Sequence, residues 1–198
     1  MTTTFKEPLI EYHRNFVKFK PRSSTDYLVV HCSATQNKPE YTWKTIDQMH
    51  RQKGWLGIGY HFVILTDGTI QNGRPIEAIG SHVLGYNDDS LGICLIGGTD
   101  RNGKSVDNFT EKQKESLKKL LDWLKSKYPK AKVLGHRDFP GVAKDCPCFD
   151  VQSWYGRGAV YVTYEDASSL DRCKLSQADL KEANGTLEFT KGDLVRIA

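Results

Sequence analysis

Residues that can bind a metal ion gather in one short segment of this chain. His136, Lys144 and Cys146 lie within eleven residues, and His31 ends an apolar run about a hundred residues upstream. Two histidines and a cysteine thiolate suit a zinc ion that keeps one coordination position open for water. A lysine two residues before the cysteine would place a positive charge beside that position. The combination predicts metal-assisted hydrolysis and not structural zinc.

Two other cysteines are alternatives to Cys146 as the thiolate ligand. Cys148 lies two residues away, and the spacing alone leaves it open. Cys32 is adjacent to His31, but successive side chains of an extended strand point to opposite faces, so we exclude it. A lone histidine is more often structural than a ligand, so the zinc interpretation depends on the whole set. Cys146 supports it, because a structural cysteine would have little to pack against in a polar loop.

Apolar runs predict that both histidines stand at the ends of strands. Residues 27–31 and 131–134 are short segments typical of strands, and each leads directly to one of the histidines. Residues 60–65 and 69–71 flank an Asp-Gly turn and predict a β-hairpin. Residues 91–96 predict a further buried strand. Strand ends are rigid, as a catalytic site requires.

Two helices are predicted between these strands. Apolar residues at helical spacing predict a helix from residue 43 to residue 50, and Gly54 should stop it. Thr110 and Gln113 form a capping-box pattern. Apolar residues follow them at helical spacing up to Pro129, which should end this second helix.

The length of 198 residues allows one ordinary α/β domain and a small appendage. Residues 1–25 are polar and rich in lysine and arginine, so we interpret them as an N-terminal arm. The composition shifts at residues 155–158, which predicts a linker. The remaining segment predicts two strands enclosing two short helices, at residues 160–164, 166–172, 177–183 and 193–197.

Charge and cysteine content restrict the cellular compartment and the partners that we expect for this protein. The formal net charge of +4 is mild and fits an anionic partner such as a cell-wall polymer or nucleic acid. Five cysteines are an odd number and do not form the framework of a disulfide scaffold. The first residues lack the apolar core of a secretory signal, and no apolar run is long enough to span a membrane. We therefore expect synthesis in a reducing cytosol.

Five motifs carry a resemblance to a known family. They are VHCSAT at 30–35, GWLGIGYHF at 54–62, GSH at 80–82 with GYN at 85–87, GICLIGG at 92–98 and KDCPCFD at 144–150. In this order they resemble the zinc N-acetylmuramoyl-L-alanine amidases, in particular the T7-type bacteriophage lysozymes, which are amidases despite their name. The resemblance covers residues 26–155. It implies an α/β catalytic domain with a central mixed β-sheet flanked by helices, and Zn²⁺ as the cofactor.

The resemblance also implies roles for seven residues. The zinc ligands would be His31, His136 and Cys146, the catalytic residues Tyr60 and Lys144, and the substrate-groove residues His82 and Asn87. Zinc would supply hydroxide at neutral pH, Lys144 would stabilise the oxyanion, and Tyr60 would hold the attacking water or assist proton transfer. Without the resemblance, Tyr60 would be interpreted as a half-buried strand aromatic and Lys144 as a solvated charge. The loop between His136 and Lys144 is about two residues longer than in the T7 type.

The predicted function is that of a phage endolysin, a bacteriolytic peptidoglycan hydrolase. It would cleave the amide bond between N-acetylmuramic acid and L-alanine, act as a monomer without inserting into membranes, and reach the wall only after another factor permeabilises the inner membrane. One alternative is a noncatalytic peptidoglycan-recognition module, but such modules commonly lack the cysteine ligand. A second is an additional role as a regulator of phage RNA polymerase, which the resemblance to the T7 type suggests.

The C-terminal segment carries a weaker resemblance of its own. The order of residues in 158–198 is similar to a LysM module, a βααβ fold that binds glycans containing N-acetylglucosamine. The usual Gly-Asp-Thr-Leu opening is replaced by Tyr164-Glu165-Asp166-Ala167. The alternative is a packing extension that only stabilises the catalytic domain. The interpretation kept here is a LysM-like module that binds the cell wall.

Overall fold

The computed structural model describes residues 6–12, 18–143, 145–156, 160–163 and 194–197. The chain divides into two compact units, Met1–Gln152 and Ser153–Ala198. The first unit contains every described residue that the sequence analysis singles out for chemistry.

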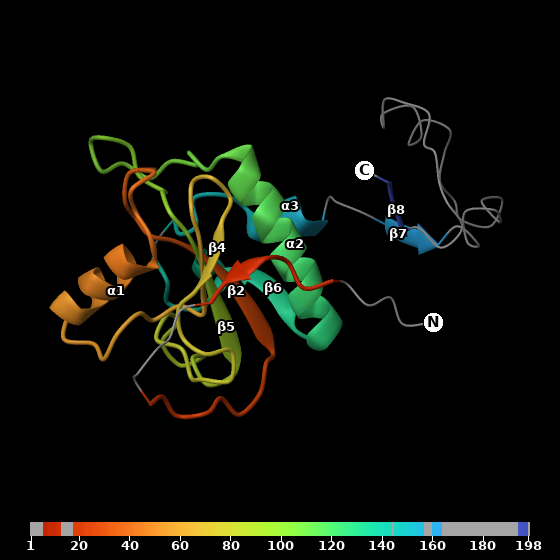
Figure 1. Cartoon of the computed structure of the whole chain (residues 1–198), viewed down its shortest axis with the longest axis horizontal. Coiled ribbons are helices and arrows are strands. Elements are labelled where there is room, and N and C mark those ends of the chain that lie inside the picture. The colour runs from red at the N-terminus through yellow and green to blue at the C-terminus, as the bar shows by residue number, and fades with distance from the viewer. Residues whose placement is uncertain (1–5, 13–17, 144, 157–159, 164–193, 198) are drawn as a thin grey trace. The chain divides into compact units, whose positions relative to one another are not determined.

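A six-stranded sheet forms the centre of the first unit (Figure 1). Its strands are β1 (Ile10–Glu11), β2 (Tyr27–Cys32), β3 (Phe62–Ile64), β4 (Ile70–Asn72), β5 (Ser90–Leu95) and β6 (Lys132–Gly135). They are arranged in the order β1-β4-β3-β5-β2-β6, and every pair is parallel except the hairpin β3–β4. The predicted central mixed sheet is thus confirmed, including the hairpin with its Asp-Gly turn.

Two helices cover opposite faces of this sheet (Figure 1). Val63 packs against Ile46 of α1 (Trp43–Gln52), whereas its neighbour Phe62 contacts Trp123 of α2 (Glu111–Lys127). Successive residues of a strand face opposite sides, so α1 and α2 lie on different faces. Two shorter helices follow β6, a 3₁₀ turn η1 (His136–Asp138) and α3 (Val151–Gly156).

Both long helices begin and end where the sequence predicts. Gln113 donates its backbone N–H to the Thr110 hydroxyl at 3.1 Å, and the Thr110 N–H donates to the Gln113 side chain at 3.0 Å. This reciprocal pair satisfies two N–H groups that a helix start leaves without partners. Gly54, with φ of +83°, follows α1 in a conformation that residues with a side chain rarely adopt.

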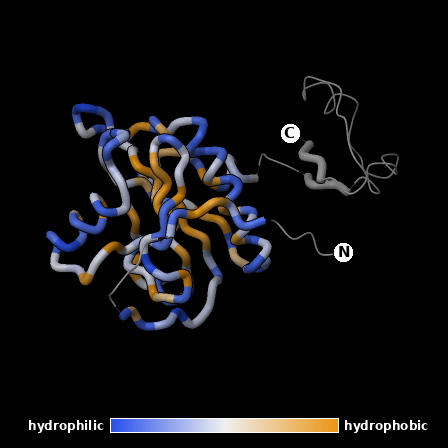
Figure 2. The backbone as a smooth tube through the Cα atoms, viewed as in Figure 1, coloured by the Kyte–Doolittle hydropathy of each residue, from blue (hydrophilic) through white to orange (hydrophobic). Residues whose placement is uncertain are grey.

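The core of the first unit consists of the central strands and the apolar stripe of α2. Figure 2 shows the hydrophobic residues gathered on these strands and the hydrophilic residues on the surrounding loops. The leucines of α2 that face the sheet are completely buried; they are Leu117, Leu120, Leu121 and Leu124. Each stabilises the fold by about 2 kcal/mol relative to an exposed position. This core holds the strand ends in fixed positions.

Part of the N-terminal segment joins the sheet. Strand β1 pairs with β4 in parallel, with Ile10 opposite Ile70. Arg22 donates to the carbonyl of Ala78 at 3.3 Å, and Arg74 stacks over Phe19 at 4.3 Å. The segment between residues 1 and 25, which the sequence suggests is an arm, therefore contributes an edge strand and contacts to the first unit.

In the second unit, the structure describes a two-stranded antiparallel sheet. Strands β7 (Val160–Thr163) and β8 (Leu194–Ile197) pair with Val160 opposite Ile197. These strands lie where the sequence predicts them. The helices predicted at 166–172 and 177–183 lie outside the described residues. Among the helices of the described part, none has the length and apolar character needed to cross a membrane.

Candidate metal centre and active site

Parallel strand pairing brings two of the predicted ligands together. Strands β2 and β6 are neighbours, with Val30 opposite Gly135, so the next residues, His31 and His136, leave the same edge of the sheet. The centroids of the two imidazole rings are 4.5 Å apart. The short helix η1 begins at His136, and the Gly135 N–H donates to the Asp138 carboxylate at 2.8 Å. This bond holds the turn that aims His136 at His31.

Cys146 completes the cluster from a loop. The Arg137 N–H donates to the Cys146 carbonyl at 2.8 Å, which folds the loop back against the start of η1. Within the described residues, His31, His136 and Cys146 are the one group whose ligand atoms could share a metal ion, all within 4.8 Å of one another. The structure thus brings together all three residues that the sequence predicts as ligands.

The geometry of this cluster fits zinc. The Cys146 Sγ lies 3.9 Å from the His31 Nδ1. Tetrahedral coordination with ordinary Zn–S and Zn–N bond lengths places such atoms about 3.6 Å apart. The Cys32 backbone N–H donates to the same sulfur at 3.3 Å. Three protein ligands of these types leave a fourth position for water or substrate.

One side of the cluster opens toward solvent. His31 is only 1% exposed, whereas His136 and Cys146 are partly exposed. A cavity of about 580 Å³ adjoins the cysteine and is lined by Gly98, Thr99 and Asp145 among others. A substrate can therefore approach from this side, whereas His31 lies at the buried base of the site.

His82 forms a hydrogen bond with the buried side of His31. Its Nδ1 lies 3.0 Å from the His31 Nε2, and its own Nε2 lies 3.4 Å from the Ser90 hydroxyl. The Ser90 hydroxyl in turn donates to the Tyr86 carbonyl. If His31 uses Nδ1 as a ligand, its Nε2–H is free to donate to His82. Burial and the neighbouring positive groups lower the pKa of His82 well below 6.5, so its ring is neutral and can accept.

Two glycines make room for the His82 ring. A Cβ atom added at Gly80 would lie 2.4 Å from the ring, and one added at Gly92 would lie 2.7 Å from it. Any larger residue at either position would displace the imidazole. The sequence reveals this packing only through the GSH and GICLIGG motifs, which do not show that their members touch.

Asn87 stabilises the loop that carries His82. Its side-chain oxygen accepts from the backbone N–H groups of His82, at 2.7 Å, and Val83, at 3.0 Å. This oxygen is thus engaged inside the protein. The predicted contacts of His82 and Asn87 with substrate remain predictions.

Tyr60 lies beside His31 on the α1 side of the sheet. The centroids of their rings are 5.0 Å apart. Burial, followed by the charges of nearby cysteines, raises the pKa of Tyr60 well above 10. The phenol is therefore protonated at neutral pH and acts as a hydrogen-bond donor. Predicted Lys144 lies outside the described residues.

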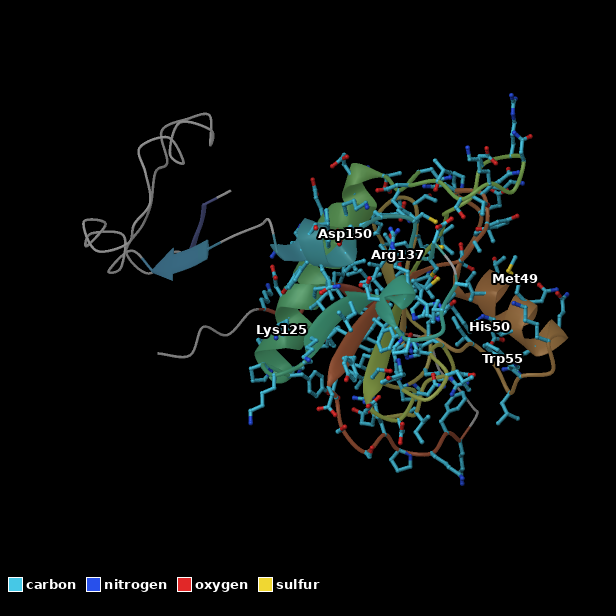
Figure 3. The ribbon with its side chains drawn as sticks, turned by 180° about the vertical axis from the view of Figure 1, so that it is seen from behind. Met49, His50, Trp55, Lys125, Arg137 and Asp150 are labelled. Atoms are coloured by element: carbon cyan, nitrogen blue, oxygen red, sulfur yellow. The ribbon has the colours of Figure 1, made fainter. Side chains whose placement is uncertain are left out.

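A set of rings connects this site to the surface. His50 of α1 and Trp55, which follows this helix, lie side by side (Figure 3), with ring centroids 4.6 Å apart, and the His50 ring lies 5.3 Å from that of Tyr60. His50 accepts from the Gly59 N–H at 2.9 Å through its Nδ1. Desolvation lowers its pKa to about 4, so it is a neutral structural residue.

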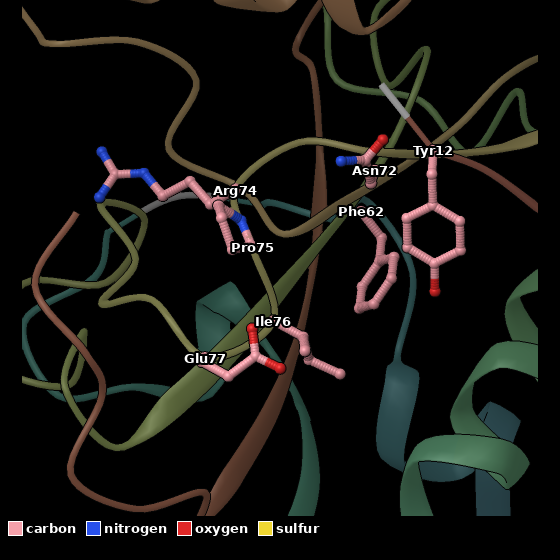
Figure 4. Close-up of a pocket in the computed structure, with 7 residues that line it drawn as sticks. All are labelled: Tyr12, Phe62, Asn72, Arg74, Pro75, Ile76 and Glu77. Carbon is pink, nitrogen blue, oxygen red and sulfur yellow. The ribbon is translucent and has the colours of Figure 1, made fainter. Parts of the chain in front are cut away.

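A second cavity lies near the edge strand β1, and it contains none of the ligands. It has a volume of about 350 Å³ and is lined by Tyr12, Phe62, Asn72 and Pro75, with Ile76 and Glu77 lower in the view (Figure 4). Arg74 also borders it, but its side chain points away from the others (Figure 4). The Arg74 guanidinium instead donates to the carbonyls of Ile58 and Ile79, each at 2.6 Å.

The fold is an α/β domain with a mixed sheet, and a His–His–Cys cluster that could hold a metal ion lies at one edge of that sheet. The chain belongs to the N-acetylmuramoyl-L-alanine amidase family, whose model matches residues 21–149. Its reaction is therefore hydrolysis of the amide bond between N-acetylmuramic acid and L-alanine in peptidoglycan. The predicted enzyme class is confirmed.

The relatives found include phage endolysins. The chain is 46% identical over 139 residues to an endolysin of Escherichia phage T7, a match that covers 70% of this chain and 91% of that protein. It is 44% identical over 142 residues to an endolysin of Enterobacteria phage K11, covering 72% and 93% of the two. Among solved structures, the N-acetylmuramoyl-L-alanine amidase LysC from Clostridium intestinale matches with a TM-score of 0.63 and 32% identity, covering 76% of this chain and 97% of that one. The resemblance to T7-type amidases is thereby confirmed.

Proposed function

We propose that His31, His136 and Cys146 hold a Zn²⁺ ion and form the catalytic centre of this amidase. One observation carries the proposal: three donor atoms of the types that zinc prefers lie within 4.8 Å of one another, beside an open cavity. When bound, zinc would polarise the amide carbonyl and lower the pKa of a water molecule from 15.7 to about 7. Cys146, and not Cys148, is the thiolate ligand in this proposal.

Tyr60 and Lys144 act on the reacting groups in this proposal. Tyr60 is close to His31 and protonated at neutral pH, so it orients the attacking water and assists proton transfer to the leaving amine. The role of Lys144 is inferred from the sequence, where it stands two residues before Cys146. Its ammonium group stabilises the developing oxyanion.

His82 is a positioning residue in the same proposal. Histidine ligands usually donate their second ring N–H to an acceptor, which fixes the ring's tautomer and orientation. The His82 Nδ1 is such an acceptor for His31, and Ser90 and the Tyr86 carbonyl fix the direction of the whole series of hydrogen bonds.

The positioning role is tested by zinc affinity. His82→Leu removes the acceptor and should weaken zinc binding roughly 10–100-fold, the range found when such partners are lost. His82→Gln retains an oxygen acceptor and should recover part of the affinity. Leu84→Ala is the control, since that side chain is 96% exposed in the same loop. Equal affinity in all three variants would contradict the role.

The reaction itself is tested on isolated peptidoglycan. Digestion should release peptides with a free N-terminal L-alanine, detectable by mass spectrometry, because the amide bond to the lactyl group is cut. The glycan strands should show no new reducing ends. New reducing ends would identify a glycosidase and refute the proposed chemistry.

We also propose where and with which partners the enzyme acts. Its similarity to endolysins supports action on the bacterial cell wall, from the host cytoplasm, after another factor permeabilises the membrane. The antiparallel pairing of β7 and β8 is compatible with a LysM-like module that binds glycans. A second proposed partner is phage RNA polymerase, on the basis of the chain's similarity to the T7 endolysin. A pull-down with the cognate polymerase tests that partner.

A further inference from the structure

Two thiols beside the metal centre have no role in the proposed reaction. The sulfur atoms of Cys32 and Cys148 lie 3.9 Å apart, and both residues line the cavity that Cys146 also lines. Cys32 ends β2, whereas Cys148 lies in the loop beyond Cys146, 116 residues later in the chain. All four cysteines of the described part are free thiols.

The backbone directs the two thiols toward each other. Cys148 has a φ of +73°, a left-handed conformation that is uncommon for a residue with a side chain. Its Sγ contacts the Gly98 carbonyl at 3.2 Å, on the inner side of the loop. A Cβ atom at Gly98 would lie 2.7 Å from the Cys32 sulfur, so the glycine leaves the space in which the sulfurs meet.

We propose that Cys32 and Cys148 form a redox-active dithiol that a small disulfide, such as oxidised glutathione, converts to an intramolecular disulfide. The Cys148 sulfur attacks the oxidant first, because Cys148 is the more exposed of the two, and releases one reduced thiol. The Cys32 sulfur then attacks the Cys148 sulfur and releases the second. Two protein thiols are oxidised, the oxidant's disulfide becomes two thiols, and the two protons pass to them.

Closure of this disulfide alters the metal centre. The sulfurs must approach from 3.9 Å to about 2.05 Å. This approach moves two segments that carry proposed ligands. His31 directly precedes Cys32, and Cys146 lies two residues before Cys148. Any backbone shift at Cys32 also changes the bond from its N–H to the Cys146 sulfur. This consequence rests on the proposed zinc site, and it predicts zinc affinity lowered roughly 10–100-fold.

The disulfide is detected by mass spectrometry of the full chain. Reduced protein is incubated with oxidised glutathione, with and without EDTA, and the remaining thiols are blocked with N-ethylmaleimide. Two of the five cysteines should become protected, and a tryptic digest should contain a peptide with Cys32 linked to one with Cys148. Cys146 and Cys148 share one tryptic peptide, so variants assign the link. Cys148→Ser should abolish it, and Cys94→Ser, at a buried cysteine, should retain it.

Each outcome decides a separate question. A wild-type chain that keeps five reactive thiols, or a link that survives Cys148→Ser, overturns the dithiol. Zinc affinity of the purified oxidised form is then measured by competition with a chelator. An affinity equal to that of the reduced form overturns the coupling to the metal centre. A disulfide in a protein that binds no zinc in either form supports the dithiol and refutes the proposed zinc site.

Discussion

Acid should destabilise the first unit through His61, which is completely buried. Its Nδ1 accepts from the Gly92 N–H at 2.9 Å, and its Nε2 lies 2.9 Å from the Ala78 carbonyl, to which it donates. Protonation would remove the acceptor, and it would place a charge on a completely buried ring, which is costly without a compensating partner. Burial therefore lowers the pKa of His61 from 6.5 to about 3.

The sign and size of the effect follow from this shift. The pKa is lower in the folded state than in the unfolded state, so the unfolded chain binds the proton first as the pH falls. The stability contributed by neutral His61 is complete above about pH 6.5 and is lost progressively between there and about pH 3. At about pH 5, His61 alone should account for a loss of roughly 2 kcal/mol in the free energy of unfolding.

A variant isolates this contribution. His61→Asn offers a side-chain oxygen in place of Nδ1 to the Gly92 N–H, but it does not titrate. Urea unfolding is followed by tryptophan fluorescence at about pH 7 and about pH 5, with EDTA present so that metal binding does not contribute. The variant should be less stable than the wild type at neutral pH, because the Ala78 carbonyl loses its donor. Between about pH 7 and about pH 5, however, the free energy of unfolding of the variant should fall by about 2 kcal/mol less than that of the wild type.

His50 titrates in both proteins, so its contribution cancels in the comparison. Equal pH dependence in the two proteins would refute the reasoning. So would a native-state NMR titration in which His61 gains its proton near pH 6.5.

Further predictions concern the metal, the catalytic residues and the tail. Purified protein should contain about one zinc per chain, and chelation should abolish lysis of the cell wall. Cys146→Ser should lower zinc content and lytic activity far more than Cys148→Ser does. The reverse order would mean that Cys148 is the ligand. Lys144→Ala should lower kcat by roughly 10²–10³ at normal zinc content. Tyr60→Phe should likewise keep zinc and fold but lose much of its rate; wild-type rates in both would refute their roles. A chain ending at Tyr155 should cleave soluble muropeptides normally but sediment less with insoluble peptidoglycan, and unchanged sedimentation would refute a wall-binding tail.

Local sequence patterns predict most of the first unit. The apolar runs before His31 and His136 predict β2 and β6, and the capping box predicts the start of α2 at Glu111, because each signal depends on neighbouring residues only. Strand β1 has two residues, too few for an alternating pattern, and it forms because β4 offers a free edge. Its position depends on tertiary structure and could not be predicted.

The sequence predicted which residues form the candidate metal cluster, but not the residues that contact them. The sequence excludes Cys32 as a ligand, and this stays a prediction, yet its backbone N–H contacts the Cys146 sulfur and its thiol faces Cys148. The alternation of side chains along a strand predicts where side chains point, but it does not predict which atom a backbone N–H contacts. The bond between His31 and His82 likewise joins residues 51 positions apart, and no spacing rule predicts such a contact.

The distance along the chain between the ligands has a consequence for biosynthesis. His31 and Cys146 are 115 residues apart, and a ribosome adding about 5–20 residues per second needs roughly 6–23 s to make the intervening chain. During that time the nascent protein already contains β2 but lacks a complete set of donors. A prematurely terminated product that ends before Cys146 lacks one of the proposed zinc ligands, so we expect it to leave the wall of the cell that made it intact. The proposed site therefore predicts activity only once nearly all of the first unit has been synthesised.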